Sequence, residues 1–139
     1  MKLFVLDTNA FIFYLKKDLN SISPIVKRFF YMSERGECTF YIPTICFWEI
    51  NRKIMTKKMI IKELQPEEAI ELAHNTIEGS SVFRDLPLTR RASSIAPTFS
   101  QKLPDPFDQL IVASALDANL PLITRDSNIH KSKLIQTVW

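Results

Sequence analysis

The chain has 139 residues, of which 46% are hydrophobic and 24% are charged, as is typical of a single globular domain with a full core. Its formal charge of +3 is too small to identify a partner by itself, and its two glycines form no glycine-rich nucleotide-binding loop. No apolar run is long enough for a signal peptide or a membrane span. Cys38 and Cys46 lie in apolar segments and are expected to be reduced core thiols. We therefore predict one cytoplasmic domain, residues 1–139, with no membrane partner.

Strands and helices alternate in the first half of the chain. Residues 3–6 are four consecutive apolar residues, which indicates a strand buried on both faces. A second strand is predicted over residues 38–42, where a β-rich run stops at Pro43. The helices predicted in this half begin at Ser, Thr, Asn or Pro signals and cover residues 10–17 (capped by Thr8 or Asn9), residues 21 or 23 to 36, and residues 44–55 with a continuation towards 59–61.

The alternation continues in the second half. Predicted helices cover residues 66–79, 89–96 and 109–118, and predicted strands cover residues 81–88, 120–124 and 134–139, with a polar loop at 98–103. Repeated strand–helix units favour a parallel sheet covered by helices. The sequence therefore predicts an α/β fold, a three-layer α/β/α sandwich with a five-stranded, mostly parallel sheet.

Acidic residues stand where strands end and helices begin. Asp7 directly follows the first strand, and Asp126 lies just beyond the fourth. Glu49 lies among bulky apolar residues near the start of a helix, and Asp105 and Asp108 are spaced to share one helix face. Each acid alone has a structural explanation, either as a turn residue bonded to nearby backbone or as a complement to a helix dipole.

Together, these acids predict a metal site. Carboxylates gathered at one sheet edge repel each other unless a cation neutralises them. Oxygen ligands suit Mg²⁺ or Mn²⁺, whereas two cysteines and two separated histidines make no zinc site. The chemistry that fits is metal-assisted hydrolysis of a phosphodiester. Basic residues suit a polyanion such as RNA, although a solvated helix face explains them equally well; the candidates are Arg52, Lys53, Arg90, Arg91 and Arg125.

Four segments resemble motifs of the PIN-domain ribonucleases, and specifically of the VapC-type toxins of bacterial toxin–antitoxin pairs. In chain order they are Leu6-Asp7-Thr8-Asn9, Thr44 to Ile50 ending in Trp-Glu-Ile, Asp105-Pro106-Phe107-Asp108-Gln109-Leu110-Ile111, and Leu122-Ile123-Thr124-Arg125-Asp126. A lone LDTN segment is weak evidence, but four motifs in the right order along the whole chain are specific.

The resemblance implies a sheet ordered 3-2-1-4-5, in which the first and fourth strands are neighbours. It also implies Mg²⁺- or Mn²⁺-dependent endoribonuclease activity, inhibition by a small antitoxin protein, and a homodimer. The metal ligands that it implies are Asp7, Glu49, Asp108 and Asp126, with Asp105 as a supporting acid or alternative ligand. Supporting roles, such as orienting carboxylates or water, fall to Thr8, Asn9 and Thr124.

Other interpretations stay open at this point. A phosphatase of the haloacid-dehalogenase type needs a second acid two residues after the first, where this chain has Asn9. A receiver-like binding domain needs paired acids and a late lysine that are not evident, and a purely structural domain requires only that the acids be scattered. Residues 54–61 interleave Lys with Met and Ile, which indicates either core packing or a partner surface that includes Met55, Met59 and Ile60.

Overall fold

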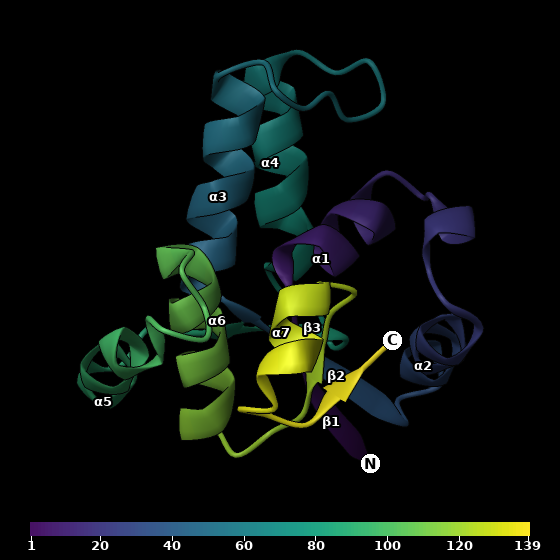
Figure 1. Cartoon of the computed structure of the whole chain (residues 1–139). Coiled ribbons are helices and arrows are strands. Elements are labelled where there is room, and N and C mark those ends of the chain that lie inside the picture. Colours follow the sequence, from purple (N-terminus) through teal and green to yellow (C-terminus); the bar gives the residue numbers. More distant parts are fainter.

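The computed structural model describes all residues from Met1 to Trp139 (Figure 1). Its strands are β1 Lys2–Leu6, β2 Cys38–Pro43, β3 Phe83–Leu86, β4 Leu122–Ile123 and β5 Thr137–Val138. Its α-helices are α1 Thr8–Leu15, α2 Pro24–Glu34, α3 Thr44–Met55, α4 Pro66–Ile77, α5 Arg90–Ile95, α6 Pro106–Asp117 and α7 Ser127–Ser132, and two short 3₁₀ helices are η1 Leu19–Ser21 and η2 Ala96–Phe99. No helix combines the length and apolar character that crossing a bilayer requires.

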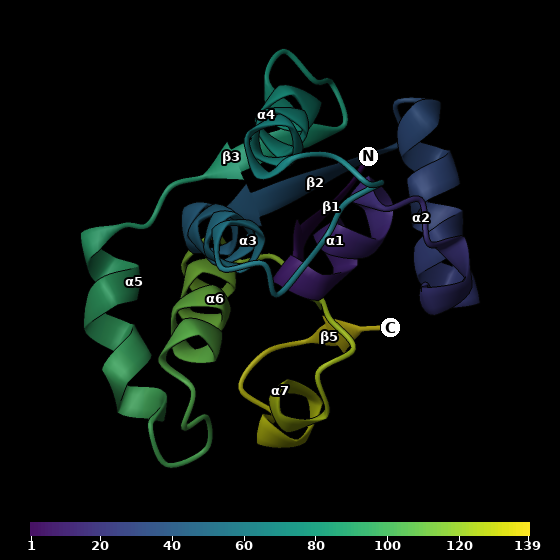
Figure 2. The same ribbon diagram turned by 90° about the horizontal axis from the view of Figure 1, so that it is seen from above.

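The five strands form one sheet in the order β3-β2-β1-β4-β5, and every neighbouring pair is parallel. The predicted fold class and strand order are therefore confirmed. The chain moves outward from β1 through β2 to β3 and then returns to β4 on the other side of β1. Because parallel crossovers are right-handed, this reversal places successive helices on opposite faces of the sheet. Figure 2 shows α4 and α6 on different sides of β2 and β3.

A row of aromatic residues fills the core on one face of the sheet. Phe4, Phe40 and Phe83 occupy matching positions on β1, β2 and β3, and each is buried. Phe29 of α2 lies 4.5 Å from the Phe4 ring, and Phe11 of α1 lies 5.5 Å from the Phe83 ring, measured between centroids. Aromatic pairs at such distances add to the gain from area burial, so this row fixes α2 against β1 and α1 against β3. The start of α1 then follows directly from β1.

Helix α3 ends earlier than its apolar pattern predicts. It stops at Met55, and Lys57 adopts a left-handed conformation with φ of 57°. The turn returns the chain to the core, where Met59 is buried with only 9% of its surface exposed. Met55 and Ile60 remain exposed at 55% and 68%. The predicted partner surface therefore keeps Met55 and Ile60, whereas Met59 belongs to the core.

Two further elements differ from the prediction. Residues 96–99, predicted as a helix end and a polar loop, form η2. Residues 127–132, for which no element was predicted, form α7, and Asp126 is its N-cap. Helix α7 is short and polar, so it carries no apolar periodicity by which to recognise it. It nevertheless determines where Asp126 lies.

Candidate active site

The site lies at the carboxyl end of β1 and β4, where the strand order reverses. Asp7 follows β1 and Thr124 follows β4, and the backbone N–H of Asp7 donates to the carbonyl of Ile123 at 3.0 Å. Ligands of open parallel sheets bind at such a reversal, outside the carboxyl ends of the strands. Helices α1, α3, α6 and α7 begin around this edge (Figure 1), and they bring the remaining acids to it.

Asp7 is a buried carboxylate held at both oxygens. Oδ1 accepts a hydrogen bond from the backbone N–H of Thr8 at 2.7 Å, and Oδ2 accepts one from the Thr124 hydroxyl at 2.6 Å. Asp7 is also the N-cap of α1, a role that the sequence assigned to Thr8 or Asn9. Burial raises its pKa, and the hydrogen bonds from Thr124 and Thr8 act in the opposite direction. Each oxygen keeps a further lone pair for a ligand.

Glu49 is coupled to the same centre through Thr8. The Thr8 hydroxyl, itself buried, donates to Glu49 Oε1 at 2.8 Å. Burial raises the pKa of Glu49, while the hydrogen bond from Thr8 and the charge of Lys53 oppose the rise. Lys53 also lowers the pKa of Asp7. Thr8 therefore holds two of the predicted acids in fixed orientations, and the positive charge of Lys53 acts on both.

Asp105 and Asp126 cap helices at the rim of the site. Asp105 accepts a hydrogen bond from the backbone N–H of Phe107 at 2.8 Å, and Asp126 accepts from those of Asn128 and Ile129 at 2.8 and 3.0 Å. The structural explanation therefore applies to both acids. Helix capping still leaves room for a second role, because each capping carboxylate keeps its other oxygen free to bind a ligand.

Asp108 is an acid whose pKa is strongly raised. Its pKa is raised to about 7, first by burial and then by the charges of Asp105, Asp126, Asp7 and Glu49. Asp108 is thus close enough to all four other predicted acids to be influenced by each. The charges of the other four acids thus all act on Asp108, and we refer to the five acids as one electrostatic unit. Strongly perturbed carboxyl groups of this kind are characteristic of functional sites.

The donor chemistry of this unit fits a hard divalent cation. Every candidate ligand is a carboxylate oxygen, which Mg²⁺ and Mn²⁺ accept readily, and a cation would remove the repulsion that raises the pKa of Asp108. No three acidic, histidine or cysteine side chains are gathered into a ready-made coordination set. Asp7 and Glu49 are oriented by threonines, whereas the side chain of Asp108 makes no protein hydrogen bond that would fix it.

Comparison with known protein families identifies the family of this chain. A family model described as the PIN domain matches residues 4–133, which is nearly the whole chain. The chain belongs to the PIN-domain family. PIN domains are nucleases, so membership supports a hydrolase. No curated protein is significantly similar to the chain in sequence.

Solved structures of similar fold come from toxin–antitoxin complexes. The PIN domain resembles VapBC from Salmonella typhimurium bound to DNA, with 23% identity, a TM-score of 0.70 and coverage of 99% of this chain and 98% of that one. It also resembles VapBC2 from Rickettsia felis bound to a DNA fragment from its promoter, with 15% identity, a TM-score of 0.68 and coverage of 98% and 97%. VapBC-1 from nontypeable Haemophilus influenzae is similar with 15% sequence identity, a TM-score of 0.65, and coverage of 98% of this chain and 96% of that one. At these identities, the likeness establishes the fold.

Sequence reasoning missed one contributor to the PIN-domain site, His130. Its Nε2 lies 2.6 Å from the carbonyl oxygen of Thr124, and its Nδ1 lies 2.6 Å from the hydroxyl of Thr137. A carbonyl only accepts, so Nε2 carries the proton in the first contact. His130 therefore ties α7 and β5 to the residue that holds Asp7. Only the register of β4 and β5 reveals this contact, because the sequence shows His130 as an isolated histidine.

The predicted basic residues divide into two groups. Lys53 acts on Asp7 and Glu49, and Arg125 packs over the Phe13 ring at 4.7 Å from its centroid. Arg90 and Arg91 lie on α5, which packs on the outer side of α6 (Figure 2), and Arg91 contacts Asp117 at 3.6 Å. Asn9, predicted to support the carboxylates, is exposed in the first turn of α1.

Proposed function

We propose that this PIN domain is a Mg²⁺- or Mn²⁺-dependent endoribonuclease. The observation that carries the proposal is the single electrostatic unit of Asp7, Glu49, Asp105, Asp108 and Asp126, within which the pKa of Asp108 is raised to about 7. A bound divalent ion supplies an activated water and stabilises the departing oxygen of the phosphodiester. Asp7, Glu49, Asp108 and Asp126 are the residues that would hold it.

The protein groups around the acids have separate tasks in this proposal. Thr8 and Thr124 hold the Glu49 and Asp7 carboxylates in position through hydrogen bonds of 2.8 and 2.6 Å. Lys53 offers a cation for the phosphates on either side of the cleaved bond. The phosphatase and receiver-like alternatives lose support, because the PIN-domain model matches residues 4–133 and the residue at position 9 is asparagine.

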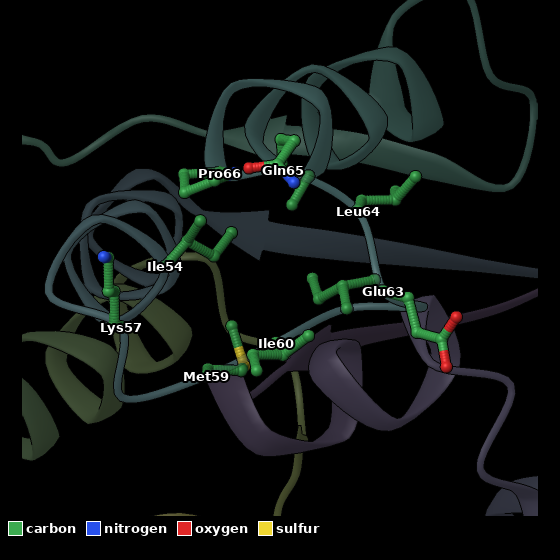
Figure 3. A pocket seen from close by; sticks show the side chains of 10 residues that line it. Ile54, Lys57, Met59, Ile60, Glu63, Leu64, Gln65 and Pro66 are labelled. Atoms are coloured by element: carbon green, nitrogen blue, oxygen red, sulfur yellow. The ribbon is translucent and has the colours of Figure 1, made fainter.

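We further propose that the enzyme is the toxin of a toxin–antitoxin pair, that a small antitoxin inhibits it, and that it forms a homodimer. Support for the antitoxin partner comes from the VapBC complexes of similar fold. A groove of about 380 Å³ between the end of α3 and the start of α4 offers an apolar surface for a partner (Figure 3). Exposed Ile60 lines this groove. The two cysteines are free and buried, which suits a reducing compartment such as the cytoplasm.

The proposal is tested by cleavage of a mixed pool of single-stranded and structured RNA in Mg²⁺ or Mn²⁺. We expect Asp7→Asn to lower the rate by at least about 100-fold, because losing even a group that merely supports a metal ligand costs 10- to 100-fold. The matched control is Asp85→Asn, which removes an exposed acid on β3 and should cut like wild type.

Two other outcomes would contradict the proposal. Equal cutting by wild type and Asp7→Asn would show that the activity belongs to a contaminant. Absence of cutting, together with a melting temperature that does not change on adding Mn²⁺, would show that the acids hold no ion. Free Mn²⁺ at a concentration about 100 times its Kd should stabilise the fold by about 2.7 kcal/mol.

A further inference from the structure

Two aromatic side chains meet at the rim of the acidic site. Trp48 of α3 immediately precedes Glu49, and Phe107 of α6 immediately precedes Asp108. Their rings are stacked, with centroids 5.3 Å apart and planes inclined by 29°. The pair thus bridges the two helices that carry these acids. Consecutive Cα atoms are about 3.8 Å apart, so each aromatic residue adjoins its acid.

The aromatic pair is not part of the hydrophobic core. Neither ring belongs to the cluster of buried residues or to the partly buried side chains packed against it. Trp48 leaves 51% of its surface exposed, although it is the largest apolar side chain near the site. Core packing therefore does not explain Trp48. A large exposed aromatic surface beside a functional site indicates a surface that a ligand covers.

Positive charge accompanies the exposed ring. The guanidinium of Arg52 lies 5.7 Å from the Trp48 ring centroid, one helical turn further along α3. Neither Arg52 nor the neighbouring Lys53 forms an ion pair with an acidic residue. An aromatic face with adjacent free cations is the combination that binds single-stranded nucleic acid, because the ring stacks on a base while the cations bind the phosphates.

We propose that Trp48, supported by Phe107 and Arg52, is a stacking platform for an unpaired base next to the scissile phosphate. This inference rests on the proposed nuclease function and deepens it, because it assigns a base-binding residue beside the acids. A base can stack on Trp48 only if it has left its own helix, so the platform would engage an unpaired nucleotide.

The platform favours RNA over a protein partner as its occupant. It adjoins Glu49 and Asp108, whereas the apolar groove that suits a partner is lined by Ile54, Met59 and Ile60 further along α3 and in the following loop (Figure 3). The Arg52 guanidinium over the Trp48 ring matches a phosphate. A protein partner at Trp48 is the competing outcome of the test.

The test uses the fluorescence of Trp48 in the full chain. Trp139→Phe removes the other of the two tryptophans, and Asp7→Asn keeps the RNA intact, which is verified on a gel. The protein is titrated in Mg²⁺ with a short unpaired RNA, with an abasic strand of the same length and charge, and with a duplex. We expect the unpaired RNA to quench Trp48 emission, and the abasic strand and the duplex to leave it nearly unchanged.

Substitution of the platform gives the quantitative result. Trp48→Ala should weaken binding of the unpaired RNA by about 5- to 150-fold, the range for one base stacked on an aromatic ring. Binding of the abasic strand should change little, and Trp48→Phe should retain most of the affinity. The matched control is Tyr31→Ala on α2, which removes an aromatic side chain of similar exposure, 54%, remote from the acids.

The outcomes that overturn the inference differ from those that overturn the nuclease function. If intact and abasic RNA bind equally while cleavage still depends on Asp7, stacking is refuted and the nuclease remains. If Trp48→Ala leaves RNA affinity unchanged but shifts the protein from dimer to monomer, the platform is a protein interface. If wild type neither binds nor cuts RNA, both proposals fail.

Discussion

The raised pKa of Asp108 leads to a prediction about metal binding and pH. Burial and then the charge of Asp105 are the two largest causes of the shift to about 7. A carboxylate must lose its proton to bind a metal ion, so at pH 7, where about half of the Asp108 groups are protonated, binding should release about half a proton per ion. For one group with a pKa of about 7, Mn²⁺ affinity should be about 10-fold weaker at pH 6 than at pH 8.

The perturbation that tests this is Asp105→Asn. It removes the negative charge that raises the pKa of Asp108 most but keeps an N-cap of nearly equal strength for α6. The pKa of Asp108 should fall, and the ratio of Mn²⁺ affinities at the two pH values should move towards unity. Calorimetric titration with Mn²⁺ in two buffers of different ionisation enthalpy measures both the affinity and the proton released. Asp85→Asn, which removes an exposed acid on β3, should leave the ratio unchanged.

The raised pKa of Asp108 also determines how the stability of the metal-free protein changes with pH. The folded-state pKa of Asp108 lies above its ordinary value of 3.8, so its favourable contribution is complete below that value and is lost as pH rises through about 7. Chelator-treated protein should therefore become less stable over this interval, and Mn²⁺ should reverse the loss. An Asp108 side-chain carbon that titrates near 3.8 by NMR, or an affinity ratio of one in wild type, would refute the reasoning.

Three further predictions concern single contacts. Thr124→Val removes the hydroxyl that donates to buried Asp7 and should lower the free energy of unfolding by about 1.5–3 kcal/mol. Thr124→Ser, the control, keeps a hydroxyl donor and should retain this stability. An unchanged melting curve for Thr124→Val would contradict the role of the 2.6 Å hydrogen bond. Asp126→Asn should abolish cleavage but keep α7 capped, whereas Asp126→Ala should also cost about 0.5–2 kcal/mol; normal cleavage by the Asn variant would make Asp126 a cap only. Met59 is buried, so Met59→Asp should destabilise the fold by at least about 2 kcal/mol. Met55 is exposed, so Met55→Asp should destabilise it by no more than about 0.5 kcal/mol. Thermal melting of both variants measures the difference.

Much of the fold was predictable because its signals are local. The apolar run before Asp7 and the β-rich run before Pro43 identify strands without knowledge of the rest of the chain. The alternation of strands and helices then restricts the sheet to a parallel arrangement, and resemblance to a family supplied the order of strands. Asp7, Asp105, Asp108 and Asp126 could be found in the same way, since each stands at or next to an element boundary, whereas Glu49 lies inside α3 and was found from its bulky apolar neighbours.

The remaining features depend on contacts between distant residues. The bond from Thr124 to Asp7 spans 117 positions and exists only because β4 pairs with β1. The end of α3 depends on Lys57, a residue type that carries no turn signal, adopting positive φ. The contact of His130 with Thr124 required α7, whose six residues include only one apolar residue, Ile129, and so give no periodic pattern.

The shortness of β4 and β5 has a consequence for local stability. Each strand has only two residues, so few backbone hydrogen bonds join residues 122–138 to the rest of the sheet. Segments with few such bonds open well before the whole protein unfolds. Amide hydrogens in this segment should therefore exchange with deuterium faster than those of β1 and β2. An ion shared by Asp7 and Asp126 would join the segment to β1, so its binding should slow exchange most strongly in the last part of the chain.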